Sequence, residues 1–123
     1  MKLIEAINRV DSLIPNTYSK MEKVAWLSNL DTDIKTQIID NYEGADQVTF
    51  AGYNENTPGD TVLLAAAPHD IMYLLWLEAM IHYHNEEFKK YNNALNMYNT
   101  AYSDFSKYYL RTHKPVGKAQ FKL

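Results

Sequence analysis

The sequence predicts an all-α protein: a small bundle of about four helices, with a loop or short β-hairpin around residues 46-64. Apolar residues recur every three or four positions through most of the chain, which is the period of a helix with one buried face. Glycine, asparagine and proline, which favour turns, collect between residues 44 and 61. We expect residues 1-110 to form a single helical domain, and residues 111-123 to form a basic, flexible tail.

The first two helices are expected near the start of the chain. Apolar residues at helical spacing over residues 3-10 predict a short helix that ends by Pro15. Residues 19-22 match a capping box, in which a serine hydroxyl and a glutamate carboxylate bind two backbone amides that the helix leaves unpaired. The second helix should therefore run over residues 20-42, with Gly44 as a left-handed residue just beyond it.

The next segment is predicted to be a loop or a short hairpin. Apolar residues alternate imperfectly over residues 48-53, and the apolar run 62-64 could return as the second strand. Pro58 and Gly59 would form the turn between them. We expect the third helix to open at Pro68, because the fixed φ of proline suits the first helical turn.

The C-terminal half carries an unbroken heptad pattern. Its members are Leu74, Leu77, Ile81, His84, Phe88, Tyr91, Leu95, Tyr98, Tyr102, Phe105 and Tyr109. Two structures fit this pattern: one helix of about 40 residues, or an antiparallel pair that turns near Asn85 or near Asn92 and Asn93. We favour the pair, because one helix about 60 Å long could not bury its stripe within so small a domain unless a partner covered it.

Composition and motifs argue against catalysis and against a cofactor. The chain has no cysteine, no nucleophile elbow and no glycine-rich phosphate loop. Glu78, His82 and His84 are the candidate metal ligands, but residues 82 and 84 lie about 200° apart around a helix. We expect Glu78 and His82 to form a surface pair and His84 to be half-buried. The sequence therefore predicts no enzyme, no metal and no cofactor.

Tyrosine and basic residues near the C-terminus predict a protein-binding face. Tyrosine combines a large apolar ring with a hydroxyl that prefers to stay hydrated, and it is enriched at protein interfaces. The four basic residues beyond residue 110 are too few to anchor nucleic acid through phosphate contacts alone, so we expect an acidic protein surface instead. The predicted interface residues are Tyr91, Tyr98, Tyr102, Tyr108, Tyr109, Arg111, Lys114, Lys118 and Phe121.

Several strings spread over nearly the whole chain resemble those of small proteins encoded beside the major capsid gene in phages and prophages of low-GC Gram-positive bacteria. The strings are PNTY (15-18), WLSNLD (26-31), LEA (77-79), YHN (83-85), KYNN (90-93) and YLRTHKP (109-115). In order and spacing they are similar to the head-tail connectors of tailed bacteriophages, which are also called adaptors or head-completion proteins.

The resemblance implies a mostly helical virion protein without catalytic residues. Its subunits would form a ring under the portal, join the capsid to the tail, and contact the portal protein and other head-completion or tail proteins. The ring would enclose DNA, but we expect no sequence-specific nucleic-acid binding and no membrane association. Such a protein would assemble in the bacterial host cytoplasm and end in the virion. The alternative is a small phage or host regulatory module that binds one partner through its C-terminal helices.

Overall fold

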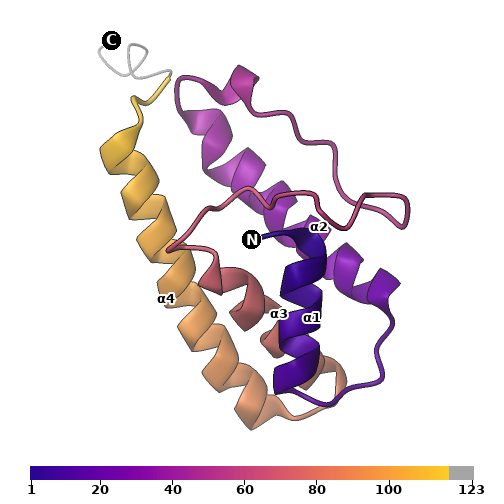
Figure 1. Cartoon of the computed structure of the whole chain (residues 1–123). Coiled ribbons are helices and arrows are strands. Elements are labelled where there is room, and N and C mark those ends of the chain that lie inside the picture. Colours follow the sequence, from indigo (N-terminus) through magenta and orange to yellow (C-terminus); the bar gives the residue numbers. More distant parts are fainter. Residues whose placement is uncertain (117–123) are drawn as a thin grey trace.

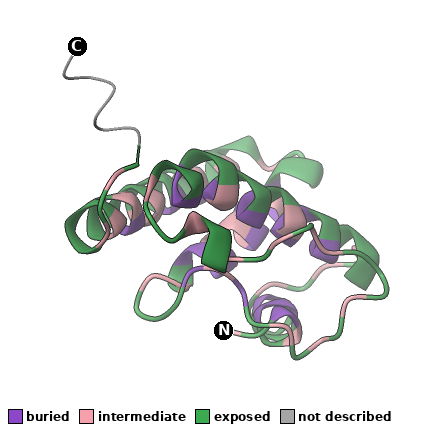
Figure 2. Ribbon diagram, turned by 90° about the horizontal axis from the view of Figure 1, so that it is seen from above, coloured by how far each residue is buried: buried purple, intermediate pink, exposed green. Residues whose placement is uncertain are grey.

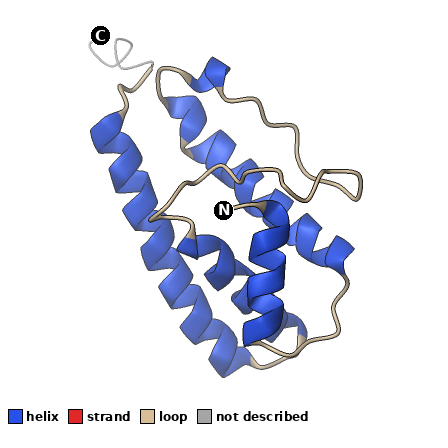
Figure 3. Cartoon of the chain, in the orientation of Figure 1, coloured by secondary structure: helices blue, strands red, loops and turns tan. Residues whose placement is uncertain are grey.

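The computed structural model describes residues 1-116, and four α-helices account for most of that part of the chain (Figure 1). The predicted all-α bundle is therefore confirmed. The elements are α1 (Leu3–Leu13), α2 (Lys20–Gln37), α3 (Ile71–His84) and α4 (Phe88–Thr112), with two 3-10 helices, η1 (Ile39–Asn41) and η2 (Ala45–Gln47). Loops join these helices, and the described residues contain no β-strand (Figure 3).

α3 is the central helix of the bundle. It packs against α1, α2 and α4. Its sequence is apolar on nearly every side, which is typical of a helix surrounded by other elements. Seven of its 14 residues are buried: Met72, Tyr73, Leu74, Leu77, Ala79, Ile81 and His82. Figure 2 shows buried positions gathered on the inner faces of the helices and exposed positions on their outer faces. The core therefore forms around α3.

The start of α2 follows its sequence signal, whereas its end does not. The Ser19 hydroxyl accepts a hydrogen bond from the Glu22 amide at 3.1 Å, which confirms the capping box. The α-helix then stops at Gln37 instead of residue 42, and η1 continues the chain as a tighter turn. Gly44 has a φ of 90°, so the predicted left-handed residue is present.

Of the two structures predicted for residues 46-64, the loop is present and the short hairpin is not. The backbone of this segment bonds elsewhere: the Leu3 amide donates to the Thr61 carbonyl at 2.8 Å, and the Leu63 amide donates to the Met1 carbonyl at 2.9 Å. The Tyr53 amide donates to the Ser28 hydroxyl at 3.0 Å. The N-terminal segment and α2 therefore already bond to these backbone amides and carbonyls. The same amides and carbonyls are not available to pair two short strands with each other.

α3 begins at Ile71, three residues later than predicted from Pro68. The His69 amide bonds to the Ala66 carbonyl at 2.9 Å, so the chain first makes a turn. α3 and α4 are two separate helices, as favoured from the sequence, and the turn lies at the predicted Asn85. Glu86 adopts a left-handed φ of 60°, and the Glu87 amide donates to the His82 carbonyl at 2.9 Å, the bonding pattern of a Schellman C-cap.

The C-terminal end of α4 also differs from the prediction. The helix continues to Thr112, so Arg111 belongs to its last turn and not to a tail that starts at residue 111. Beyond it, the Glu43 amide donates to the Lys114 carbonyl at 2.7 Å, and the Val116 amide donates to the Asn41 carbonyl at 3.0 Å. Residues 114-116 are therefore held in extended form beside η1.

Candidate protein interface

Three of the predicted interface tyrosines attach α4 to the rest of the molecule. Tyr98 is only 8% exposed, and its ring centroid lies 4.9 Å from that of Trp76 on α3. Tyr102 is half-buried beside Tyr98, with ring centroids 5.9 Å apart. Tyr109 is half-buried, with its ring centroid 5.1 Å from that of Tyr42, just beyond η1, and 3.7 Å from that of His113. Burial raises the pKa of each of these three hydroxyls. These rings are part of the internal packing.

The other predicted interface residues are more accessible and lie far apart along α4. Tyr91 is half-buried near the α3–α4 turn, with its ring 5.2 Å from that of Tyr83. Tyr108 is exposed near the opposite end of the helix. Arg111 and Lys114 are exposed there as well. The predictions for Lys118 and Phe121 lie outside the described residues. The structure thus divides the predicted face instead of bringing its residues together.

An open groove of about 430 Å³ lies between the end of α1 and the first half of α4. The aliphatic side chains at its rim are strongly exposed: Leu13 by 68% and Met97 by 60%. The remaining lining residues are Ile14, Pro15, Glu78, His82, Lys90, Asn93 and Ala94. Sequence reasoning missed Leu13 and Met97, because neither belongs to the heptad stripe.

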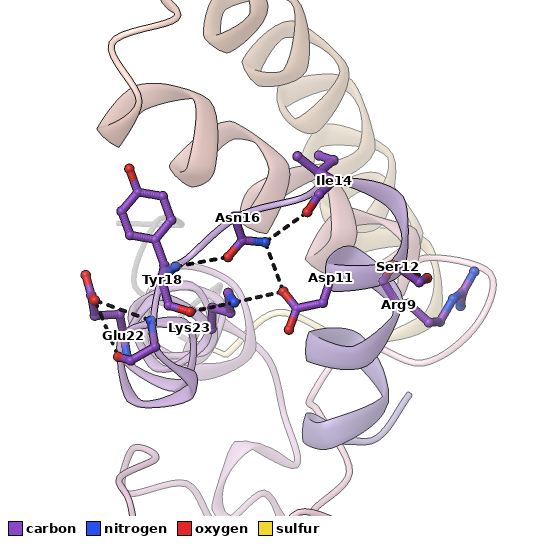
Figure 4. Close-up of polar contacts among 9 residues, drawn as sticks. Arg9, Asp11, Ser12, Ile14, Asn16, Tyr18, Glu22 and Lys23 are labelled. Carbon is purple, nitrogen blue, oxygen red and sulfur yellow. Dashed lines mark hydrogen bonds and ion pairs between the residues drawn. The ribbon is translucent and has the colours of Figure 1, made fainter.

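An ion pair between a buried lysine and an exposed aspartate fixes the segment that forms one edge of the groove (Figure 4). The Lys23 ammonium group is 3% exposed and lies 2.8 Å from an Asp11 carboxylate oxygen. It also donates to the Tyr18 carbonyl at 2.8 Å. The Asn16 amide group donates to the same Asp11 oxygen at 3.0 Å and to the Ile14 carbonyl at 2.9 Å. This network connects α1 to α2 and holds residues 14-18 in place.

The same network lowers the pKa of Asp11. Burial acts to raise it, but the hydrogen bonds from Lys23 and Asn16 and the positive charge of Lys23 outweigh that effect. Asp11 is therefore ionised at neutral pH. The buried Lys23 keeps a partner for its charge.

The histidines near the groove have the reverse of the predicted burial. His82 is buried, and its Nδ1 atom lies 2.9 Å from a carboxylate oxygen of Glu87. Glu78 lies 3.7 Å from Nε2 of the same ring. His84 is exposed and stacks on Trp26, with centroids 5.2 Å apart. The His82 hydrogen bond, with Asn85 and Lys90, lowers the pKa of Glu87 to about 2. His82 thus ties the start of α4 to α3.

The outer face of α4 beside the groove carries no charge over thirteen residues, from Tyr91 to Ser103. Its exposed positions are Asn92, Asn93, Asn96, Met97, Asn99, Thr100 and Ser103. We call these seven residues the amide face. Solvent-facing helix surfaces are usually charged, whereas the cores of protein interfaces are depleted of charge. Asparagine is also a poor helix former. This charge-free run is the sequence signal that could have located the surface.

Asp31 organises a second polar cluster, deep in the core. Its carboxylate accepts hydrogen bonds from the Tyr73 hydroxyl at 2.6 Å, the Tyr53 hydroxyl at 2.5 Å and the Leu64 amide at 3.1 Å. The Tyr73 hydroxyl in turn accepts one from the Ala65 amide at 2.7 Å. Burial raises the pKa of Asp31 against these donors. The cluster fastens the long loop to α2 and α3.

Metal-binding clusters, unpaired buried polar atoms and helices able to span a membrane are absent from the described residues. They contain no cluster of three or more histidine, cysteine or acidic side chains that could hold a metal ion. Every buried side-chain nitrogen and oxygen atom among them has a hydrogen-bond partner. No helix in residues 1-116 is long and apolar enough to cross a membrane. Comparison with protein-family models, with curated proteins and with solved structures finds no match for this chain.

Proposed function

We propose that this chain is a structural subunit of a head-tail connector, in which copies form a ring under the portal of a tailed phage and join the capsid to the tail. Two lines of reasoning support the proposal. The six strings between Pro15 and Pro115 resemble those of connector proteins and spread over nearly the whole chain. The bundle also presents two chemically different surfaces at the two ends of α4, and this second observation carries the proposal.

A ring of identical subunits needs two such surfaces. Each contact joins one patch of a subunit to a different patch of its neighbour, and the rotation between neighbours closes the ring. On the first half of α4 this chain has the groove, and the amide face continues from it along the middle of the helix as far as Ser103. At the other end of α4 it exposes Tyr108, Leu110 and Arg111. Within residues 1-116 both surfaces keep exposed side chains, which neighbours or the portal could contact.

A non-catalytic role agrees with the polar interior. The buried ionisable groups Asp31 and Lys23 have their bonding capacity occupied by residues of the same chain. An active site instead directs titratable groups with altered pKa values into an open pocket, toward a reacting molecule. In this chain the two clusters join helices and loops to one another, which favours a mechanical function.

Size-exclusion chromatography with light scattering tests the proposal. The purified chain is run alone and then mixed with the portal protein of the same genome. We expect a co-eluting complex that contains several copies of the chain per portal ring, and ring-shaped particles in negative-stain micrographs. A stable dimer whose mass does not change when portal is added would overturn the connector proposal. That result would favour the regulatory alternative.

The matched variants are Met97→Asp and Met21→Asp. Both methionines are exposed, by 60% and 56%, but Met97 lies in the groove rim and the amide face, whereas Met21 lies on α2. We expect Met97→Asp to prevent assembly on the portal and Met21→Asp to leave it unchanged. Circular dichroism of both variants shows that the fold is kept. Equal loss of assembly in the two would contradict a role for the α4 surface.

A further inference from the structure

We propose that the groove between α1 and α4 receives the C-terminal end of α4 from a second copy of this chain. The inserted residues would be Leu110 and Tyr108. This inference deepens the proposed function, because it names the two surfaces through which neighbouring subunits meet.

The groove has the composition of a docking site for an apolar side chain. Leu13 and Met97 stand at its rim, and Ile14, Pro15 and Ala94 add further carbon surface. The network around Lys23 and Asp11 holds the α1 edge in place before any partner arrives. A pre-formed edge reduces the ordering cost of binding. The neighbouring amide face carries no charge that would have to be desolvated.

The opposite end of α4 presents Leu110, which is largely exposed, and Tyr108, whose ring lies 4.8 Å from that of His69 and keeps part of its surface exposed. Leu110 is 56% exposed, and Tyr108 is 38% exposed. Burying these side chains against a neighbour would remove apolar surface from water, which favours association. The end is also rigid, because residues 114-116 are hydrogen-bonded to the backbone beside η1. It can therefore enter a groove without losing much conformational freedom.

The charges around the two surfaces are complementary. Lys107, Arg111 and Lys114 are exposed around Leu110. On the groove side, Glu78 is part of the lining, and Glu86 and Glu87 lie in the adjoining turn. Lys90 is the one basic residue in the lining, and it pairs with Glu87 at 3.4 Å. Opposite charges at the rim of an interface favour one orientation and speed association.

The two surfaces cannot meet within one molecule. Lys90, in the groove, and Leu110 are twenty residues apart on a continuous helix, a rise of about 30 Å. The occupant must therefore come from another copy, and the contact joins different patches on the two subunits. Repeated contacts of this kind give a ring or an open filament, depending on the rotation between neighbours.

Disulfide cross-linking tests this pairing directly, because the natural chain has no cysteine. Met97→Cys and Leu110→Cys variants are prepared separately, mixed, and oxidised both alone at high concentration and with portal present. We expect a cross-linked dimer in the mixture and none from either variant by itself. The matched control replaces Leu110→Cys with Glu55→Cys, an exposed loop position beside α2, and should give no cross-link.

The outcomes separate this inference from the proposed function. Rings that form on the portal while the mixture stays uncross-linked would overturn the pairing and leave the connector role standing. A mixed cross-link in a protein that ignores the portal would support the pairing and remove the connector role. Cross-linking of Met97→Cys with itself would show a two-fold contact between amide faces and would also overturn the pairing.

Discussion

α3 and α4 pack against each other, yet they bury very different shares of their length. Seven of the 14 residues of α3 are buried, against only Ala94, Tyr98 and Phe105 among the 25 residues of α4. α3 touches every other helix, whereas α4 rests mainly on α3 and leaves its outer side open. The two helices therefore have different functions in the structure. α3 holds the fold together, whereas α4 provides exposed surface. Substitutions in α3 should therefore mainly lower the stability of the fold. Substitutions on the outer side of α4 should mainly affect assembly.

The largest expected effect is on stability, from shortening a buried side chain of α3. Leu77 is fully buried, so Leu77→Ala should leave a cavity and lower the free energy of unfolding by about 3 kcal/mol. Met97→Ala on α4 should change it by less than about 0.5 kcal/mol, because Met97 is 60% exposed. Urea denaturation followed by circular dichroism measures both. Similar losses in the two variants would remove the contrast between the helices.

A second test concerns the polar centre beside α3. Asp31→Asn keeps the size of the side chain but leaves one oxygen where the Tyr53 hydroxyl, the Tyr73 hydroxyl and the Leu64 amide converge. We expect a loss of about 2 kcal/mol, because a buried donor without an acceptor costs roughly 1 to 3 kcal/mol. Thermal and urea unfolding should agree on the loss. An unchanged stability would mean that the carboxylate is not needed to hold the loop.

The two tyrosines of this cluster form a matched pair. Tyr73→Phe removes the bond to Asp31 and leaves the Ala65 amide without its acceptor, whereas Tyr53→Phe removes one bond at a half-buried site. We expect losses of about 2 and about 1 kcal/mol respectively. Urea denaturation of both variants in one buffer gives the comparison. A larger loss for Tyr53→Phe than for Tyr73→Phe would show that the hydrogen bond from the loop contributes more to stability than the hydrogen bond from α3.

On α4, removing asparagines should stabilise the isolated chain. Asn92 and Asn99 are exposed within the helix, so the pair Asn92→Ala and Asn99→Ala should raise the free energy of unfolding by about 1 kcal/mol in total. If the amide face binds a neighbour, the same variant should assemble less well on the portal. Thermal unfolding and light scattering give the two results. A gain in stability with unchanged assembly would contradict a binding role for the amide face.

The smallest expected effect is a pH dependence at the turn between the two helices. The pKa of Glu87 is lowered to about 2, chiefly by its hydrogen bond with His82, so its ionised form favours the folded state. That contribution is present above the ordinary glutamate pKa near 4.5 and is lost as the pH falls toward about 2. We expect wild type to melt higher than Glu87→Gln at pH 5, with the two curves converging near pH 2. If the melting temperatures of wild type and Glu87→Gln differ by the same amount at every pH in this range, Glu87 makes no pH-dependent contribution to stability.

Much of the fold could be predicted from the sequence, because the relevant signals are local. The capping residues Ser19 and Glu22 are three positions apart, and the three-four spacing of apolar residues follows from the helical repeat itself. The turn at Asn85 was one of two candidates. The heptad phase continues through this turn even though His84 and Phe88, its two members there, are exposed. An unbroken phase therefore does not require an unbroken helix.

The errors arose where the partners of a segment lie far away in the sequence. The backbone of residues 59-64 bonds to the N-terminus and to Asp31, and these contacts replaced the predicted hairpin. His82 was expected at the surface, but the turn after α3 places Glu87 against it and the core closes around it. Tyr98 was assigned to an interface, but Trp76 covers its ring. Periodicity cannot show which of several helix faces a neighbour will cover.

By itself, the sequence determined that this chain is helical, where α2 begins and that the outer side of α4 carries no charge between residues 91 and 103. These properties depend on residues one or two helical turns apart. Only the tertiary structure decided that Asp31 meets two tyrosines, that Leu13 and Met97 frame one groove, and that the tyrosines of α4 divide between core and surface. Such pairings depend on how the helices pack, and helix packing is set by the whole core at once.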